Sequence, residues 1–128
     1  MYWYVVLDSV DDEVSKMDTD SVIADDNIEY STLEYWNKRY ENNKQINYDW
    51  FKNFDQLQSQ LVKLVPNKNS SILHLGCGNS LLGPDLYSLG YHNITNIDYS
   101  STVIESMKLQ LKDIPGLEWV VGDVFQEI

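Results

Sequence analysis

A short apolar run that ends in a pair of glycines constrains the fold of this chain more than any other feature. Residues 72–75 carry a large side chain at every position, which is typical of a parallel strand covered by helices on both faces. Gly76 and Gly78 follow at once, and glycine lets a backbone turn sharply or approach a ligand closely. Residues 81–89 then have helical spacing. This order predicts an α/β sheet, in which ligands bind outside the carboxyl ends of the strands.

A second strand is expected at residues 93–97, and it ends at Asp98. An acid at that place can accept hydrogen bonds from both hydroxyls of a ribose. The dinucleotide fingerprint G-x-G-x-x-G requires a third glycine, but Leu81 occupies that position. A nucleoside ligand without phosphate, such as S-adenosylmethionine, therefore fits the turn better than a dinucleotide. A nicotinamide-binding domain is the weaker alternative.

The chain is acidic, and its acids are unevenly distributed. Twenty Asp and Glu against nine Lys and Arg give a net charge of -11, which argues against nucleic acid as the main partner and favours a basic protein surface. Residues 1–30 hold nine of the acids and predict a disordered acidic tail. The strand-like stretch at 1–7 leaves three possibilities open: an edge strand, a cover over an apolar surface, or an unusual start of the chain.

Several classes of protein and site are disfavoured by what the sequence lacks. A single cysteine cannot form an internal disulfide, and the apolar run at 1–7 is too short for a signal peptide or a membrane span. We therefore expect a cytoplasmic protein that is not bound to a membrane. Cys77 has no C-x-x-C partner, so a small residue that fits the turn is a stronger interpretation than a catalytic thiol. His74 and His92 lack the spacing of metal ligands, so no metal site is predicted.

Helices are expected before the first of these strands and after the second. The sequence STLE at 31–34 resembles a capping box that opens a helix through Tyr40. Trp36 and Tyr40 share a face of that helix, either as plain core packing or as an aromatic pair beside a nucleoside pocket. Residues 54–64 carry an apolar stripe typical of a core helix. Thr102 and Glu105 could form a capping box for a last helix, which precedes a third strand at 117–121.

A strand–helix–strand–helix–strand order with a candidate ligand residue after each strand resembles the class I S-adenosylmethionine-dependent methyltransferases. Within that class, four motifs are similar to those of the elongation factor 1-alpha lysine methyltransferases of the methyltransferase-like family. They are EYWNKRY at 34–40, YDWF at 48–51, LGCGNS at 75–80 and NIDYS at 96–100. The resemblance implies an α/β, Rossmann-like class I methyltransferase fold that is truncated after the third parallel strand and preceded by N-terminal helices. Residues 31–128 would be a partial methyltransferase domain.

The resemblance also implies a role for each residue of the glycine turn and the second strand end. Gly76 and Gly78 would let the methionine portion of the cofactor approach the backbone. Asp98 would bind the ribose hydroxyls, and Tyr99 would pack beside the adenine. We expect Asp98, as a strand-end acid, to be largely solvated before a ligand binds, so that its replacement weakens cofactor binding with little effect on folding.

The other cofactor contacts implied by the resemblance come from the third strand end and the N-terminal helices. Asp123 would accept a hydrogen bond from the adenine amino group, and Val124 would form an apolar wall. Trp36, Tyr40 and Trp50 would close the pocket from the N-terminal side. The alternative for Asp98 and Asp123 is that each is an exposed strand-end acid that caps the next helix.

The implied activity is S-adenosylmethionine-dependent transfer of a methyl group to a lysine on a basic protein surface, with elongation factor 1-alpha as the expected substrate. Catalysis in this class is mostly positioning, and the lysine, with an ordinary pKa of about 10.4, must first lose its proton. Family members carry a Lys-Gly-Thr-Leu-Asp-like segment after the fourth strand that borders the acceptor. The sequence ends at Ile128, before such a segment, so no catalytic residue is identified.

Two expectations follow from that ending. The chain alone is expected to be inactive, and the alternative function is a catalytically inactive cofactor-binding or regulatory module. In this class the strand order is 3-2-1-4-5-7-6, so the fourth strand pairs with the first. We therefore expect an unpaired edge beside residues 72–75, unless residues 1–7 fold back onto it.

Overall fold

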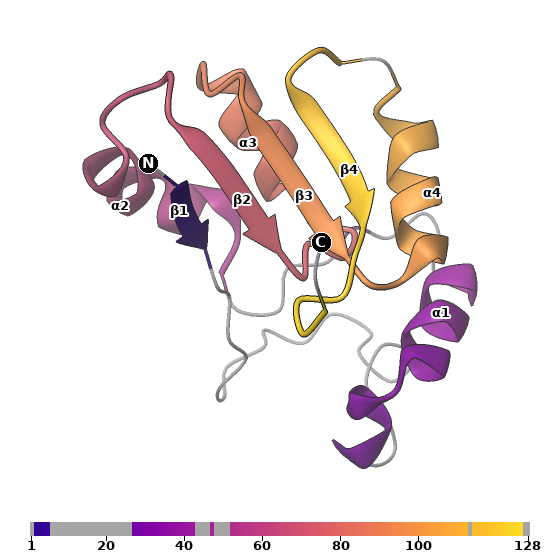
Figure 1. Ribbon diagram of the computed structural model, residues 1–128. Helices are drawn as coiled ribbons and strands as arrows, with labels where there is room; N and C mark the ends of the chain where they lie inside the picture. The colour runs from indigo at the N-terminus through magenta and orange to yellow at the C-terminus, as the bar shows by residue number, and fades with distance from the viewer. Residues whose placement is uncertain (1, 6–26, 43–46, 48–51, 113, 127–128) are drawn as a thin grey trace.

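Four parallel strands form one sheet in the computed structural model (Figure 1), in the order β1-β2-β3-β4. The structure describes residues 2–5, 27–42, 47, 52–112 and 114–126. The strands are β1 (Tyr2–Val5), β2 (Ser71–Leu75), β3 (Ile94–Asp98) and β4 (Leu117–Val121). All of them run in the same direction, so the carboxyl ends of β2, β3 and β4 meet at one edge. The predicted α/β class and the three predicted strands are confirmed.

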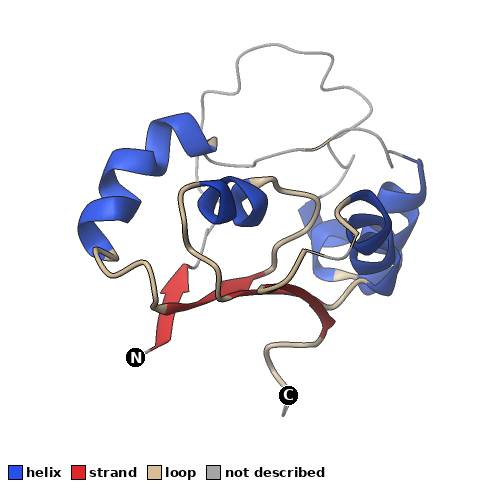
Figure 2. Cartoon of the chain, turned by 90° about the horizontal axis from the view of Figure 1, so that it is seen from above, coloured by secondary structure: helices blue, strands red, loops and turns tan. Residues whose placement is uncertain are grey.

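The described helices all lie on one face of the sheet, as the view from above shows (Figure 2). They are the 3-10 helix η1 (Asn27–Ser31), α1 (Leu33–Asn42), α2 (Phe54–Leu64), α3 (Leu82–Ser88) and α4 (Ser101–Gln110). In β2 the residues that face these helices, Ile72 and His74, are buried, whereas Leu73 and Leu75 on the other face are only half-buried. The expectation of helices on both faces is therefore wrong for the described residues.

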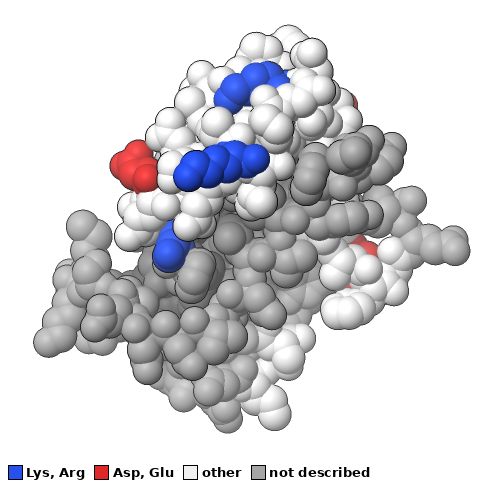
Figure 3. Space-filling model, turned by 90° about the vertical axis from the view of Figure 1, so that its left-hand side faces the viewer, with Lys and Arg blue, Asp and Glu red and all other residues white. Residues whose placement is uncertain are grey.

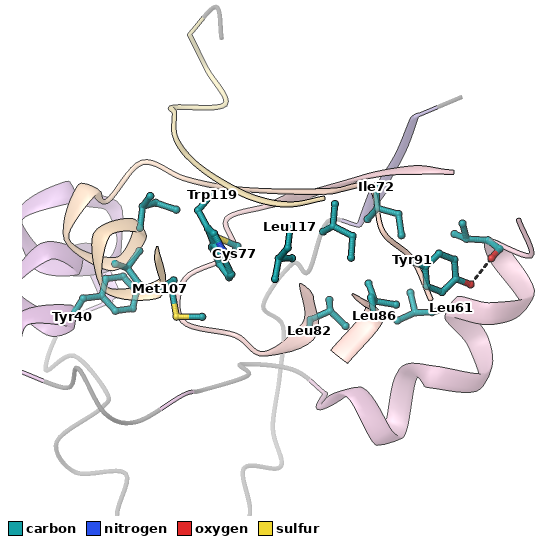
Figure 4. Close-up of a cluster of buried hydrophobic side chains, with 14 residues drawn as sticks. Tyr40, Leu61, Ile72, Cys77, Leu82, Leu86, Tyr91, Met107, Leu117 and Trp119 are labelled. Carbon is teal, nitrogen blue, oxygen red and sulfur yellow. Dashed lines mark hydrogen bonds between the residues drawn. The ribbon is translucent and has the colours of Figure 1, made fainter. Parts of the chain in front are cut away.

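The core fills the space between the sheet and the helices (Figure 4). Ile72 on β2 is in register with Ile94 on β3, which is in register with Leu117 on β4, so three large side chains form a row across the sheet. Leu86 of α3 and Met107 of α4 are buried against this cluster. Burying a side chain of this size contributes about 1.5–3 kcal/mol to folding, so the row accounts for much of the stability of the described fold.

Tyr91 anchors α2 to the rest of the core. Its side chain is fully buried, and its hydroxyl donates a hydrogen bond to the carbonyl oxygen of Val65 at the end of α2, 2.5 Å away (Figure 4). Leu61 of α2 is buried as the apolar stripe predicts, but Leu64 at the end of the stripe is 60% exposed and Val65 is buried in its place. α2 ends at Leu64, and Val65, its C-cap residue, occupies the buried position.

The helix starts differ from the predicted capping boxes. Thr32, rather than Ser31, caps α1, because its hydroxyl accepts a hydrogen bond from the Tyr35 backbone N–H. Ser100, rather than Thr102, caps α4 and accepts from the Val103 backbone N–H. In both cases the N-cap lies one or two residues from the predicted position. Several hydroxyls occur together in each stretch, so the motif alone does not select among them.

The first strand covers the edge of β2 that was expected to be unpaired. Tyr2 lies opposite Ser71 and Val5 opposite His74 in a parallel register. Of the three possibilities for this stretch, the edge strand is the one observed. A disordered tail over residues 1–30 is therefore wrong for Tyr2–Val5 and for η1, while residues 6–26 lie outside the described part of the chain. None of the described helices combines the length and apolarity needed to span a bilayer.

Candidate functional site

The glycine turn after β2 forms the centre of the carboxyl edge. Gly76 has a φ of 61° and Gly78 a φ of 50°, and both values lie in the left-handed region that other residues adopt only with strain. A Cβ added to Gly76 would meet nothing within 4 Å, so the space above this residue is open. A Cβ added to Gly78 would lie 2.6 Å from the Tyr40 hydroxyl oxygen. Gly76 is therefore required by its backbone conformation, and Gly78 also by its close neighbour.

Asp98, at the end of β3, is a buried carboxylate with two backbone partners. It is 7% exposed, its Oδ2 accepts from the Gly78 N–H at 2.9 Å, and its Oδ1 accepts from the Ser100 N–H at 2.9 Å. Burial raises the pKa of Asp98 above its usual range, and the backbone donors oppose that shift. The expectation of a solvated acid is wrong, because Asp98 joins the glycine turn to the start of α4 in the structure without ligand.

The backbone hydrogen bonds do not use the whole acceptor capacity of Asp98. An ionised carboxylate offers about four lone-pair sites; the N–H groups of Gly78 and Ser100 use two, and the Tyr99 N–H also acts on the carboxylate. The alternative in which the acid only caps the next helix is incomplete, since one oxygen accepts from the turn after β2. Asp98 can therefore hold its own loops together and still present an acceptor to a ligand hydroxyl.

The third strand end brings Asp123 and Val124 to the same edge. Asp123 is half-buried, and its Oδ1 accepts from the backbone N–H of Phe125 at 3.0 Å. It thus closes a turn, whereas the alternative of an exposed acid that caps a helix is not observed, since residues 123–126 form no helix. Burial raises the pKa of the Tyr99 hydroxyl, and the negative charges of Asp98 and Asp123 raise it further. Asp98 is in register with Val121 of β4, and the Gly122 N–H donates to the Asp98 carbonyl oxygen at 3.0 Å, so the predicted residues at the ends of β3 and β4 converge.

Apolar side chains extend this edge toward solvent. Val124, predicted as an apolar wall, is 50% exposed. Phe125 beside it is 94% exposed and was not singled out in the sequence. Phe125 directly follows the predicted pair of Asp123 and Val124, and no sequence pattern would have identified it as part of this edge.

Helix α1 borders the glycine turn with aromatic side chains. Tyr40 is 7% exposed, and its ring stacks on that of Trp36 with 6.0 Å between the ring centroids. Burial raises the pKa of the Tyr40 hydroxyl, and the charge of Asp98 adds to the rise. The indole Nε1 of Trp36 donates to the carbonyl oxygen of Tyr30 at 2.8 Å. The two interpretations of Tyr40 are therefore compatible, since it belongs to the core and also borders the turn.

Trp50 lies outside the described residues, so the structure does not place this predicted site residue. Asn47, three residues before it, is described and was not singled out in the sequence. Its Nδ2 donates to the carbonyl oxygen of Asn79 in the glycine turn at 2.7 Å, and its Oδ1 accepts from Gln110 of α4 at 3.3 Å. Asn47 itself is thus attached to the glycine turn and to α4.

Asn37 and Ser100 were also missed. The Ser100 hydroxyl donates to Asn37 Oδ1 at 2.5 Å, which links α1 to the start of α4. A serine two residues after a strand-end acid is a possible N-cap signal, and it could have identified Ser100. The sequence carries no comparable signal for Asn37, because its partner lies 63 residues away along the chain.

Polar residues elsewhere in the sheet have structural partners. The buried His74 Nδ1 lies 3.0 Å from Asn96 Oδ1, and Asn96 Nδ2 donates to the Glu118 carbonyl oxygen at 3.1 Å. Cys77 is 2% exposed and burial raises the pKa of its thiol, which suits a side chain that packs inside the turn. Among the described residues, no group of three or more His, Cys, Asp or Glu could hold a metal ion.

Comparison with known proteins identifies relatives over part of the chain. Mouse EEF1A lysine methyltransferase 4 is 35% identical over 104 residues, which cover 80% of this chain and 40% of that protein. The bovine protein of the same name is 34% identical over 107 residues, with the same two coverages. Mouse eEF1A lysine and N-terminal methyltransferase is 36% identical over 80 residues, which cover 62% of this chain and 11% of that protein. No protein-family model matches. The chain thus spans well under half the length of these relatives.

Proposed function

The chain is related over 80% of its length to EEF1A lysine methyltransferases, and on this premise we propose that it binds S-adenosylmethionine as the cofactor-binding part of a protein-lysine methyltransferase. The observation that carries the proposal is the carboxylate of Asp98, which lies at the carboxyl end of β3 and contacts the glycine turn directly. Ligands of open parallel sheets bind at this edge. Relatives with methyltransferase names and a nucleoside-type site at that edge point to the same cofactor.

The described residues fit the nucleoside part of this cofactor. Asp98 keeps acceptor capacity for a ribose hydroxyl beside its bonds to backbone N–H groups. Open space above Gly76 leaves room for the chain that joins the ribose to the amino acid. Asp123 uses Oδ1 for its own turn, and its second oxygen can accept from the adenine amino group. Tyr99 and Val124 would flank the adenine ring.

Charge at the edge favours S-adenosylmethionine over NAD. Asp98 ends β3 and Asp123 follows the neighbouring strand β4, so two carboxylates lie at the edge where the ligand would bind. The sulfonium and ammonium groups of S-adenosylmethionine are attracted to such a place, whereas the pyrophosphate of NAD is repelled. Leu81 at the N-cap of α3 is half-buried and packs against the core, so the third glycine position of the dinucleotide fingerprint is filled by a side chain.

When bound, S-adenosylmethionine would supply an activated methyl group on its sulfonium. The part of the reaction that this chain's residues can perform is positioning. Asp98 would fix the ribose, and the stacked pair of Trp36 and Tyr40 would border the glycine turn and exclude water from that side. Fixing the donor in this way lowers the entropic cost of the transfer step.

The acceptor that we propose is a lysine of elongation factor 1-alpha, because both groups of relatives are named for that substrate. The net charge of -11 is compatible with a basic protein surface as partner. On the side of the molecule seen in Figure 3, described lysine or arginine side chains are separated by uncharged ones instead of forming a continuous strip. A cytoplasmic location is proposed together with this substrate.

Calorimetric titration tests the cofactor. We expect S-adenosylmethionine and S-adenosylhomocysteine to bind the chain more tightly than NAD does. The variant Asp123→Ala should weaken S-adenosylhomocysteine binding about tenfold or more, since a hydrogen bond to a charged group is worth about 1.5–3 kcal/mol. Asp55→Ala, which removes an exposed acid of α2, is the matched control and should leave the affinity unchanged. Tighter binding of NAD, or equal affinity of Asp123→Ala and wild type, would contradict the proposal.

The acceptor is tested with tritiated S-adenosylmethionine and purified elongation factor 1-alpha. A methyltransferase for this substrate should transfer label to a lysine of the factor and not to an unrelated control protein. Label on an unrelated control protein, with none on the factor, would contradict the substrate.

A further inference from the structure

A closed set of contacts connects α1, the glycine turn, the end of β3 and the start of α4. Asp98 accepts from the N–H of Gly78 and from the N–H of Ser100, both at 2.9 Å. The Ser100 hydroxyl donates to Asn37 Oδ1 at 2.5 Å. Tyr40, on the same helix as Asn37, lies so close to Gly78 that a Cβ there would be 2.6 Å from its hydroxyl oxygen. This set of contacts therefore begins and ends on α1.

Asn37 and Tyr40 are three positions apart, so they project from the same side of α1. One helix face thus makes two contacts with the candidate site, through Asn37 at the α4 start and through Tyr40 at the glycine turn. Figure 1 shows α1 beside the end of α4 that follows β3. A displacement of α1 at Asn37 would therefore also displace Tyr40.

The hydrogen bond from Ser100 to Asn37 is partly buried, and its donor hydroxyl belongs to a buried residue. Ser100 is 0% exposed, and its hydroxyl oxygen already accepts from the Val103 N–H, so its remaining need is an acceptor for its proton. Asn37 Oδ1 supplies that acceptor. Buried hydroxyls are almost always satisfied in this way, and losing the partner carries a free-energy cost.

Few side chains pack α1 against the rest of the protein. Of its ten residues only Arg39 and Tyr40 are buried, Trp36 is partly buried against the core, and Leu33 is 42% exposed. A helix of this length is marginal in water without tertiary contacts. Elements with few buried apolar contacts open locally at low free-energy cost, so a single polar contact has a large effect on their position.

We propose that Asn37 is a positioning residue of the site: its hydrogen bond with Ser100 holds α1 where Tyr40, stacked on Trp36, borders the glycine turn. Asn37 itself need not touch the ligand. The effect on a ligand rests on the proposed S-adenosylmethionine site, whereas the effect on α1 does not. These two consequences can be measured separately.

The experiment uses the full chain with four variants. Asn37→Ala removes the acceptor, and Asn42→Ala is the matched control, since Asn42 is exposed on the same helix. Ser100→Ala removes the donor together with the α4 cap, and the double variant tests whether Asn37 acts through Ser100. Hydrogen exchange without ligand reports on α1 and on β3, and calorimetry with S-adenosylhomocysteine reports on the site.

In Asn37→Ala we expect the amides of α1 to exchange about tenfold faster, those of β3 to be unchanged, and the dissociation constant to rise about tenfold, as loss of one partly buried hydrogen bond implies. Asn42→Ala should match wild type. In the Ser100→Ala background, adding Asn37→Ala should change either quantity by less than about twofold.

The proposal would be overturned if the α1 amides of the Asn37→Ala variant exchanged at the wild-type rate. So would faster exchange throughout the sheet, because Asn37 would then support the whole fold, or an equal effect of Asn37→Ala in both backgrounds, because it would then act independently of Ser100. If wild type binds no S-adenosylhomocysteine, the proposed function fails, and the exchange data still decide whether Asn37 positions α1.

Discussion

Replacing Asp98 with asparagine keeps the shape of the side chain but removes one of its two acceptor oxygens. In the structure both oxygens accept from backbone N–H groups at 2.9 Å, and the carboxylate is 7% exposed. Asparagine can accept from the N–H of Gly78 or of Ser100, and its own amide NH₂ then faces the other donor. We expect this variant to lose stability even without a ligand.

The size of the loss follows from these contacts. A hydrogen bond to a charged group contributes about 1.5–3 kcal/mol, and a buried N–H that loses its partner costs about 1–3 kcal/mol. Burial raises the pKa of Asp98, so the wild-type charge also carries a desolvation cost that a neutral amide avoids. The net decrease in the free energy of unfolding should be about 1–3 kcal/mol for Asp98→Asn, and about 2–4 kcal/mol for Asp98→Ala, where both donors lose their partner.

Urea unfolding at neutral pH, followed by circular dichroism and tryptophan fluorescence, measures this difference. Asp123→Asn is the control, because Asp123 is half-buried and accepts one N–H in a turn, so it should cost less than about 1 kcal/mol. An unchanged dependence on urea concentration would show that the transition compares the same two states. If Asp98→Asn were as stable as wild type, Asp98 would not support the two loops as the structure indicates.

Three further predictions concern the same region and the core. Burial raises the pKa of Asp98 above its ordinary 3.8, so ionising this carboxyl costs the folded state free energy as the pH rises from about 4 through the folded-state pKa. The difference in the free energy of unfolding between wild type and Asp98→Asn should therefore be larger near pH 4 than at neutral pH in urea unfolding, and a difference that grows with pH would contradict the direction of the shift. Gly76→Ala should lower the free energy of unfolding by about 1–2 kcal/mol through left-handed strain alone. Gly78→Ala should cost about 1–3 kcal/mol more, because Tyr40 must move, and thermal denaturation showing equal losses would refute that contact. Tyr91→Phe should cost about 1–2 kcal/mol by removing a buried hydroxyl that donates to a backbone carbonyl, whereas an unchanged melting temperature would show that this bond contributes nothing.

The strands and the glycine turn could be predicted from the sequence because their signals are local. The third strand, Leu117–Val121, has the predicted bounds, and Gly76 and Gly78 have the left-handed conformations that their position after a strand implied. The side-chain pattern that identifies a strand repeats every two residues, and a turn is encoded by the residues that make it. The same local patterns predicted that Asp98 ends its strand and lies at the same edge of the sheet as Gly76.

The burial and the hydrogen-bond partners of each side chain at that edge depend on contacts between segments that are distant in sequence. Whether Asp98 is solvated depends on Gly78, Ser100 and the helix that covers them, and no local pattern reports on that burial. The pairing of Tyr2–Val5 with β2 likewise brings together segments that share no motif.

The sequence by itself therefore determined the element types, the turn chemistry and the edge at which a ligand would bind, because each depends on residues a few positions apart. Only the tertiary structure decided that the described helices cover one face of the sheet, that Asp98 is a buried link between loops, and that Asn37 holds α1 near them. Burial and hydrogen-bond partners are properties of the space around a side chain, and that space is filled by residues from other parts of the chain.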